Sequence, residues 1–248
     1  MEKIFLTAEW QHLIMANYVI DPKILQPYLP ANVEVDFWKG QTYISLVGFL
    51  FKNTKIMGFS VPFHKQFEEV NLRFYVRYKD KSTSLGTWKR GVVFIREIVP
   101  LPTIAWTANI IYREPYITLP MKHEITHVEN TDKSNGNQQL SVKYLWKYES
   151  EWNELSVKAN SKATAIQANS EAEFITEHYW GYTKWNENKT AEYQVEHPTW
   201  NIFEVNDYKI QCNVSKLYGS VFEEVMQKPS SVLLAEGSDI IVRKGLFL

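Results

Sequence analysis

The segment from Phe67 to Arg77 carries the side chains with the clearest potential for chemistry. Its apolar and polar residues alternate with a period of two, so it predicts a strand with two different faces. The polar face holds one acid and two guanidinium groups among Glu69, Asn71, Arg73, Tyr75 and Arg77. A guanidinium presents a rigid fork of donors that matches a carboxylate, and a nearby glutamate can hold that fork or exchange a proton.

Two interpretations of this polar face are open from the residues alone. If the face meets solvent, it is the ordinary exposed side of an antiparallel strand, because such strands commonly turn apolar residues inward and polar residues outward. If it lines a cavity, it is a binding or catalytic site.

A second motif, His123-Glu124-Ile125-Thr126-His127, satisfies the letters of a helical zinc-binding pattern. Ile125 and Thr126 favour a strand, in which the two histidines would lie about 13 Å apart, too far for one metal ion. We therefore predict no metal site. The sequence contains no nucleophile elbow, phosphate loop or dinucleotide fingerprint, so we also predict no cofactor.

The elements that must position these residues are mostly strands. Strand-like segments recur and are separated by polar or Gly/Pro-containing connections. They run from Tyr43 to Phe51, Val70 to Tyr78, Gly91 to Val99, Leu140 to Lys147 and Val157 to Ile166. This spacing predicts a mostly antiparallel sheet or barrel.

Three short helices and one exposed turn are also expected. The helices run from Lys23 to Tyr28 after Asp21-Pro22, from about Pro102 to Tyr112, and from Ser215, a candidate N-cap, to Met226. The polar segment from Glu129 to Gln139 contains an Asn-Gly pair and predicts a hairpin tip. Without a linker or a repeat, residues 1–248 are expected to form one domain, a boundary near the hairpin tip being the alternative.

Composition narrows the class of protein. The 27 basic and 28 acidic residues among 248 give a formal net charge of −1, so no general field attracts nucleic acid or an anionic membrane. The single cysteine, Cys212, excludes an internal disulfide. The first residues contain no signal-peptide core, and no window approaches the roughly 20 apolar residues of a membrane span. We expect a soluble, cytoplasmic protein.

Several short phrases together resemble the YqjF-like family of uncharacterised proteins, within the acetoacetate decarboxylase-like superfamily. The phrases are Asn17-Tyr18, Leu25 to Pro30, Tyr43-Ile44-Ser45-Leu46-Val47, Phe67 to Arg77, Glu114-Pro115-Tyr116 and His178-Tyr179-Trp180-Gly181-Tyr182. The resemblance implies a mostly β (α+β) fold: an antiparallel β-barrel with a few peripheral helices around an internal cavity. It also makes a homodimer plausible, because barrels of this superfamily often assemble.

The resemblance also identifies a departure from the decarboxylase. There, a cavity lysine forms a Schiff base with a β-keto acid, in a site that also contains glutamate and arginine. The resemblance makes Glu69 the counterpart of an active-site glutamate, whereas Tyr116 and Ile117 stand where the lysine pair is expected. Because a phenol cannot form an imine, we do not expect Schiff-base decarboxylation, and Lys122 lies six positions later.

We therefore expect a cavity that binds a small organic acid or carbonyl compound. The predicted ligand-binding residues are Arg73, Arg77, Arg90 and Trp180. If the protein is instead a lyase-type or hydratase-type enzyme, the predicted catalytic residues are Glu69, as general base, and Tyr116.

Two further residues and one further hypothesis complete the predictions. His64 and Glu97 are second-line candidates, and alternation along the strand places Arg90 and Glu97 on opposite faces. The third hypothesis is a protein-interaction module whose aromatic faces bind a partner.

Overall fold

The computed structural model describes residues 2–60, 66–81, 86–103, 113–128 and 138–248. Within these residues, mostly antiparallel strands form one sheet. The strands are β1 (Ile4–Ile20), β2 (Val33–Val35), β3 (Thr42–Ile56), β4 (Phe59–Ser60), β5 (Gln66–Asp80), β6 (Thr87–Val99), β7 (Tyr116–Thr118), β8 (Met121–Val128), β9 (Gln139–Tyr148), β10 (Glu151–Ala165), β11 (Trp180–Asn186), β12 (Lys189–Glu196), β13 (Asn201–Gln211), β14 (Ser231–Arg243) and β15 (Leu246–Phe247). The predicted mostly β fold is confirmed.

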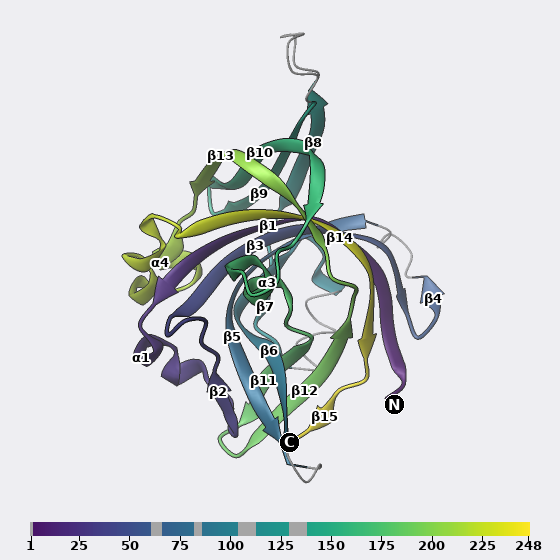
Figure 1. Ribbon diagram of the computed structural model, residues 1–248, viewed down its shortest axis with the longest axis vertical. Coiled ribbons are helices and arrows are strands. Elements are labelled where there is room, and N and C mark those ends of the chain that lie inside the picture. The colour runs from purple at the N-terminus through teal and green to yellow at the C-terminus, as the bar shows by residue number, and fades with distance from the viewer. Residues whose placement is uncertain (1, 61–65, 82–85, 104–112, 129–137) are drawn as a thin grey trace.

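Seven of the described strands close into a ring. Neighbouring strands follow the order β12-β11-β6-β5-β3-β1-β14, and β14 pairs back with β12. Figure 1 shows these strands curving around a common centre. The closing contact is short, since it joins Val195 to Val242 and Glu196 to Ile241. Helix α3 (Glu171–Thr176) packs inside the ring, where Phe174 lies against the rings of Tyr43 and Tyr75.

A second layer covers the outer face of the ring. Strands β13, β10, β9 and β8 continue the sheet beyond β14 and pack against β1 and β3. Gly48 of β3 permits this close approach, because a Cβ at this position would lie 3.0 Å from Tyr144 and 3.1 Å from Leu155. The apolar face of β5, formed by Val70, Leu72, Phe74 and Val76, is buried between the layers. The polar face of β5 therefore points into the ring.

The helices are short and lie at the edges of the sheet, apart from α3. Pro22–Leu25 (α1) and the 3-10 turn Gln26–Tyr28 confirm the helix predicted after Asp21, whose side chain accepts a hydrogen bond of 2.9 Å from the Lys23 amide. The helix predicted from about 102 to 112 falls, from residue 104 on, outside the described residues. No helix in the described residues is long and apolar enough to cross a membrane.

The single helix predicted from Ser215 to Met226 is wrong. The chain forms α4 (Val214–Leu217) and two 3-10 turns, Ser220–Phe222 and Val225–Gln227. Asn213, rather than Ser215, caps α4. Gly219 interrupts the helix because its φ of 115° lies outside the right-handed helical region.

The histidine pair lies on a strand, as predicted. His123 and His127 belong to β8, which pairs antiparallel with β9 from Met121 opposite Trp146 to Val128 opposite Gln139. Nδ1 of His123 lies 2.5 Å from Oε1 of Glu68. The tip of the predicted hairpin, residues 129–137, falls outside the described residues.

Candidate functional site

A cavity of about 210 Å³ lies inside the ring, and each of the seven ring strands contributes to its lining. Much of its wall is aromatic. This part of the lining includes Trp10, Phe49, Phe51, Phe67, Phe94, Trp180 and Trp200. The volume is below the roughly 300–1,000 Å³ of sites for drug-sized ligands, so the cavity suits a small molecule.

Strand β5 contributes three polar side chains to the lining of the cavity. Glu69, Asn71 and Arg73 alternate with the buried apolar residues, and their exposed fractions are 3%, 1% and 8%. The side chain of Asn71 donates a hydrogen bond of 2.9 Å to Oε1 of Glu69. The polar face of this strand therefore meets a cavity and not bulk solvent.

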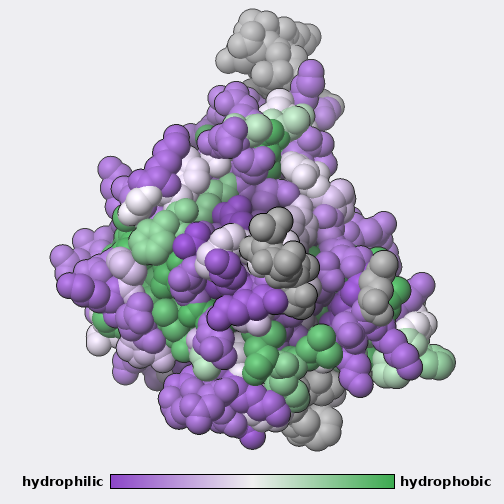
Figure 2. All heavy atoms as spheres, turned by 60° about the horizontal axis from the view of Figure 1, so that its bottom comes forward, coloured by the Kyte–Doolittle hydropathy of each residue, from purple (hydrophilic) through white to green (hydrophobic). Residues whose placement is uncertain are grey.

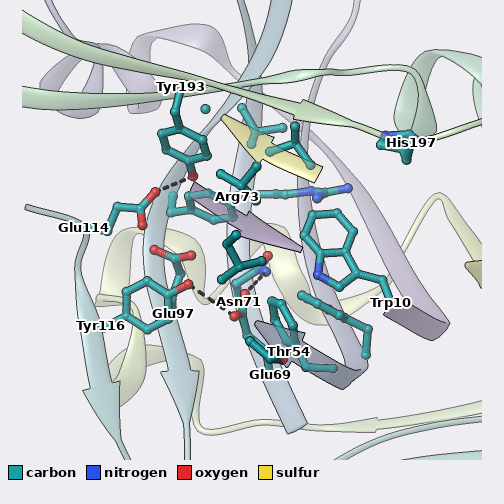
Figure 3. Close-up of a pocket in the computed structure, with 18 of the residues that line it drawn as sticks. Trp10, Thr54, Glu69, Asn71, Arg73, Glu97, Glu114, Tyr116, Tyr193 and His197 are labelled. Carbon is teal, nitrogen blue, oxygen red and sulfur yellow. Dashed lines mark hydrogen bonds between the residues drawn. The ribbon is translucent and has the colours of Figure 1, made fainter. Parts of the chain in front are cut away.

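Two more glutamates join Glu69 and form what we call the carboxyl cluster: Glu69, Glu97 and Glu114. Glu97 lies on β6 and is 1% exposed, and Glu114 precedes β7 and is 6% exposed. The hydroxyl of Tyr116 donates a hydrogen bond of 3.2 Å to Oε2 of Glu69, and that of Tyr193 donates one to Oε1 of Glu114. Figure 3 shows these five side chains gathered at one side of the cavity.

A bulge in β6 brings Glu97 into the cavity. Leu72 pairs with Arg96 and Arg73 with Phe94, so Ile95 is an extra residue in the ladder. Glu97 consequently shares the cavity face with Phe94. The prediction that alternation alone separates Arg90 from Glu97 is wrong, because the bulge reverses the alternation between them.

Burial raises the proton affinity of the whole cluster. It raises the pKa of Glu69 to about 7, and that of Glu114 to about 8. Burial, followed by the charges of Glu114 and Glu69, raises the pKa of Glu97 well above its ordinary value. Three neighbouring carboxyl groups in a low-dielectric site cannot all ionise. The cluster therefore holds protons near neutral pH.

Arg73 provides the positive charge of the site. Among the described residues that line the cavity, it is the one lysine or arginine. One terminal nitrogen lies 3.8 Å from Sδ of Met15, and Cζ lies 5.8 Å from the centre of the Tyr75 ring. Its Nε has no hydrogen-bond partner, and its side chain makes no ion pair, within the part of the chain that the structure describes. Arg73 is thus a buried cation with unused donor capacity.

The other predicted site residues are distributed differently. Trp180 lines the cavity. Arg77 lies outside it, 2.9 Å from Oε1 of Glu34 and against the ring of Trp88. Arg90 also lies outside the lining and pairs with Asp36 at 2.7 Å. His64 falls outside the described residues.

Three groups at the site were not predicted as site residues: Glu114, Tyr193 and His178. Tyr193 reaches Glu114 because Gly181 leaves room for it: a Cβ on Gly181 would lie 2.1 Å from the Tyr193 ring. His178 lines the cavity, with Nε2 at 3.4 Å from Oδ2 of Asp36, and burial lowers its pKa to about 4. The Trp180-Gly181 phrase was a usable signal, since a glycine between large aromatic residues marks a close approach.

These groups support two kinds of chemistry. Arg73 can hold a carboxylate or a developing oxyanion. Glu69 has a pKa suited to proton transfer near neutral pH, and Tyr116 contacts it directly. No described residue of the lining is a lysine that could form an imine. No group of three or more His, Cys, Asp or Glu side chains in the described residues is arranged to hold a metal ion.

Comparisons of sequence identify the family of the chain. A family model, DUF2071, described as an uncharacterized conserved protein, matches residues 7–239. YqjF of Bacillus subtilis (strain 168), itself uncharacterized, is 29% identical over 116 residues. That match spans 46% of this chain and 45% of YqjF, so less than half of the curated relative is covered.

Solved structures of similar fold are acetoacetate decarboxylase-like. The enduracididine biosynthesis enzyme MppR with HEPES buffer bound gives a TM-score of 0.66 at 11% identity, over all of this chain and 88% of MppR. Acetoacetate decarboxylase from Legionella pneumophila gives 0.61 at 13% identity, over 98% of this chain and 87% of that one. An acetoacetate decarboxylase-like enzyme from Sphingomonas wittichii RW1 gives 0.64 at 10% identity, over 99% and 93%. At these identities the likeness establishes the fold alone.

Proposed function

The chain belongs to the DUF2071 family of uncharacterized conserved proteins, and we propose that it binds a small organic acid or carbonyl compound inside the ring of strands. The observation that carries this proposal is Arg73, a buried guanidinium that lines the cavity with no carboxylate at ion-pair distance among the described residues. A buried charge is costly unless it is paired. A ligand carboxylate would supply the missing partner through a charge-assisted hydrogen bond.

The fold neighbours support a ligand of this class. MppR has been solved in complex with pyruvate, a small keto acid. The structure of that complex aligns with all of this chain at a TM-score of 0.65. A keto acid offers a carboxylate for Arg73 and a carbonyl group for the polar side chains of the carboxyl cluster.

Thermal shift with a matched pair of arginine variants tests the proposal. The ligands are pyruvate, levulinate, lactate and butanoate, and the variants are Arg73→Gln and Arg77→Gln. Both arginines lie on β5, but Arg77 pairs with Glu34 outside the cavity. An acid present at 100 times its Kd would stabilise the folded state by about 2.7 kcal/mol. We expect a rise in Tm that Arg73→Gln abolishes and Arg77→Gln preserves. No rise with any acid, or an undiminished rise in Arg73→Gln, would overturn the proposal.

A second candidate function is proton transfer at a carbon next to the bound carbonyl. The observation that favours it is the pKa of Glu69, which burial raises to about 7, close to the pH at which a general base works best. The electron pair left on the ligand would move to its carbonyl oxygen, where Tyr116 or Arg73 would stabilise the oxyanion. This chemistry would belong to a lyase-type or hydratase-type enzyme.

Isotope exchange tests the second candidate without knowledge of the full reaction. Levulinate is incubated with the protein in D₂O, and loss of its protons next to the carbonyl is followed by proton NMR. We expect exchange that falls by roughly 10²–10⁴-fold in Glu69→Gln. The control, Glu124→Gln, changes an exposed glutamate of β8 that pairs with Lys143. Equal exchange in both variants would contradict a role for Glu69.

The interaction-module hypothesis receives less support. It predicts a large exposed aromatic patch and no enclosed cavity. The ring contains a cavity of about 210 Å³. On the face seen in Figure 2, apolar residues lie in separate patches among hydrophilic side chains.

A further inference from the structure

The side chains of a buried arginine and a buried glutamic acid line the same cavity without a hydrogen bond between them. Nε of Arg73 and Oε2 of Glu97 each have no hydrogen-bond partner among the described residues. The two residues are 8% and 1% exposed. Figure 3 shows the guanidinium of Arg73 extending away from the side where Glu97 and Glu114 lie.

A buried donor or acceptor without a partner costs free energy, and charged groups cost most. An ordinary carboxylic acid would satisfy Arg73 and leave Oε2 of Glu97 unpaired. One molecule can satisfy both groups if it carries an acceptor at one end and a donor at the other. The two ends of such a ligand would lie at different places in the cavity, because the guanidinium of Arg73 extends away from the side where Glu97 lies.

The charges of the lining indicate which donor group the ligand carries. The carboxylate of a ligand neutralises the one positive charge of the described lining, that of Arg73. Any ionised member of the carboxyl cluster is then left without a counter-charge in a site of low dielectric. A hydroxyl group would supply a hydrogen bond but no charge. An ammonium group supplies both, and the aromatic wall, which includes Trp10 and Phe94, favours a cation and the short hydrocarbon chain beside it.

We propose that the ligand is a short amphoteric molecule, with a carboxylate at Arg73 and an ammonium group among Glu69, Glu97 and Glu114. This inference rests on the proposed function, because it concerns the same cavity and the same contact of Arg73 with an acid. It adds the class of ligand: a carboxylic acid with an amine a few bonds away.

Matched pairs of acids test this inference by isothermal titration calorimetry of the wild-type protein at pH 7. The pairs are butanoate and 4-aminobutanoate, pentanoate and 5-aminopentanoate, and hexanoate and 6-aminohexanoate. The members of a pair differ by the ammonium group, and the three pairs sample three lengths. We expect the amino acid of at least one pair to bind tenfold or more tightly than its parent acid, which corresponds to about 1.4 kcal/mol.

A glutamate variant then locates the ammonium group. In Glu97→Gln we expect the advantage of the amino acid over its parent acid to fall below threefold. The control, Glu124→Gln, lies outside the cavity on β8 and should keep the full advantage. Glu114→Gln provides a second cavity variant if Glu97→Gln does not fold.

The outcomes separate this inference from the function on which it rests. If the parent acids bind and no amino acid binds better, the inference is overturned and the proposed function stands. An advantage that survives in both cavity variants also overturns it. If none of the six acids binds while pyruvate, levulinate or lactate still raises Tm, the inference is overturned and the proposed function stands. If those acids do not bind either, both proposals fail.

Discussion

The phenol of Tyr116 and the carboxyl group of Glu69 meet inside the ring through a hydrogen bond of 3.2 Å. Tyr116 lies on β7 and Glu69 lies on β5. Both strands pair with β6, which lies between them in the sheet. Burial raises the pKa of Glu69, whereas the hydrogen bonds from Asn71 and Tyr116 lower it. The pKa of Glu69 therefore depends on both burial and these hydrogen bonds, and a single substitution that removes one hydrogen bond should change it.

Removal of the phenol should raise the pKa of Glu69 above about 7. Tyr116→Phe deletes a donor that favours the ionised carboxylate and leaves the ring in place. The measurement is a carbon NMR titration of glutamate side-chain carboxyl groups in the wild type and in the variant. Tyr208→Phe is the control, since Tyr208 is 43% exposed on β13. An unchanged titration of Glu69 in Tyr116→Phe would show that the hydrogen bond does not tune it.

The carboxyl cluster should also make stability depend on pH. The folded-state pKa of Glu114, about 8, exceeds the value of about 4.3 expected in the unfolded chain. The folded state then binds more protons than the unfolded state between these values, so the contribution of Glu114 to stability is lost as pH rises from about 4.3 through 8. Glu114→Gln cannot ionise. We expect the variant to gain a few kcal/mol relative to wild type between pH 5 and pH 8, measured by urea unfolding.

The quantity to compare is the difference in the free energy of unfolding between Glu114→Gln and wild type, because other titrating groups also change stability with pH. Burial lowers the pKa of His178 to about 4, so its contribution to stability is lost in the opposite direction, as pH falls below about 6.5. Both proteins keep His178, and its effect cancels in the difference. A stability difference that is constant from pH 5 to pH 8 would contradict the raised pKa of Glu114.

Gly181 should be required for the position of Tyr193. A methyl group at Gly181 would occupy the space of the Tyr193 ring, which holds Glu114 by a hydrogen bond. We expect Gly181→Ala to destabilise the protein by about 1–3 kcal/mol, as overpacked sites do, and to weaken ligand binding. Unfolding measurements should show that Tyr193→Leu costs less in the Gly181→Ala background than in wild type, because the two side chains compete for one space. Simple additivity of the two changes would refute the clash.

Reduction with borohydride should leave the protein unmodified in the presence of a keto acid. An imine requires an amine, and the described lining of the cavity contains no lysine. Intact-mass spectrometry after treatment with levulinate and borohydride measures the outcome, and acetoacetate decarboxylase serves as the positive control. A mass increase that matches one reduced adduct would establish Schiff-base chemistry at a lysine elsewhere in the chain.

The sequence predicted the face of β5 but not how far along the strand the cavity extends. Alternation placed Glu69, Arg73 and Arg77 on one side, and that side is turned into the ring for the first two. Alternation does not tell where along the strand the cavity ends. It therefore could not show that Arg77 lies outside the cavity and pairs with Glu34. The apolar residues of the same strand were correctly assigned to a buried face.

The rest of the cluster depends on contacts between residues distant in sequence. Glu97 lines the cavity because of a bulge in β6, and no residue type in β6 predicts that bulge. Glu114 accepts a hydrogen bond from Tyr193, which lies 79 positions later in the sequence. Local signals were available for α3, where Ser170 accepts a hydrogen bond from the Glu173 amide and the Glu173 side chain accepts one from the Asn169 amide. This capping arrangement, Ser-x-x-Glu, was overlooked.

The position of β1 between β3 and β14 bears on how the chain acquires its structure. The first long strand is flanked by a strand near it in sequence and by one that begins at Ser231. During synthesis β1 can pair with β3 early, but its other edge stays open until β14 leaves the ribosome. An open edge of this length invites pairing with other chains. The protein should therefore fold slowly, as chains dominated by distant pairings do, and its nascent form should depend on chaperones more than its finished form does.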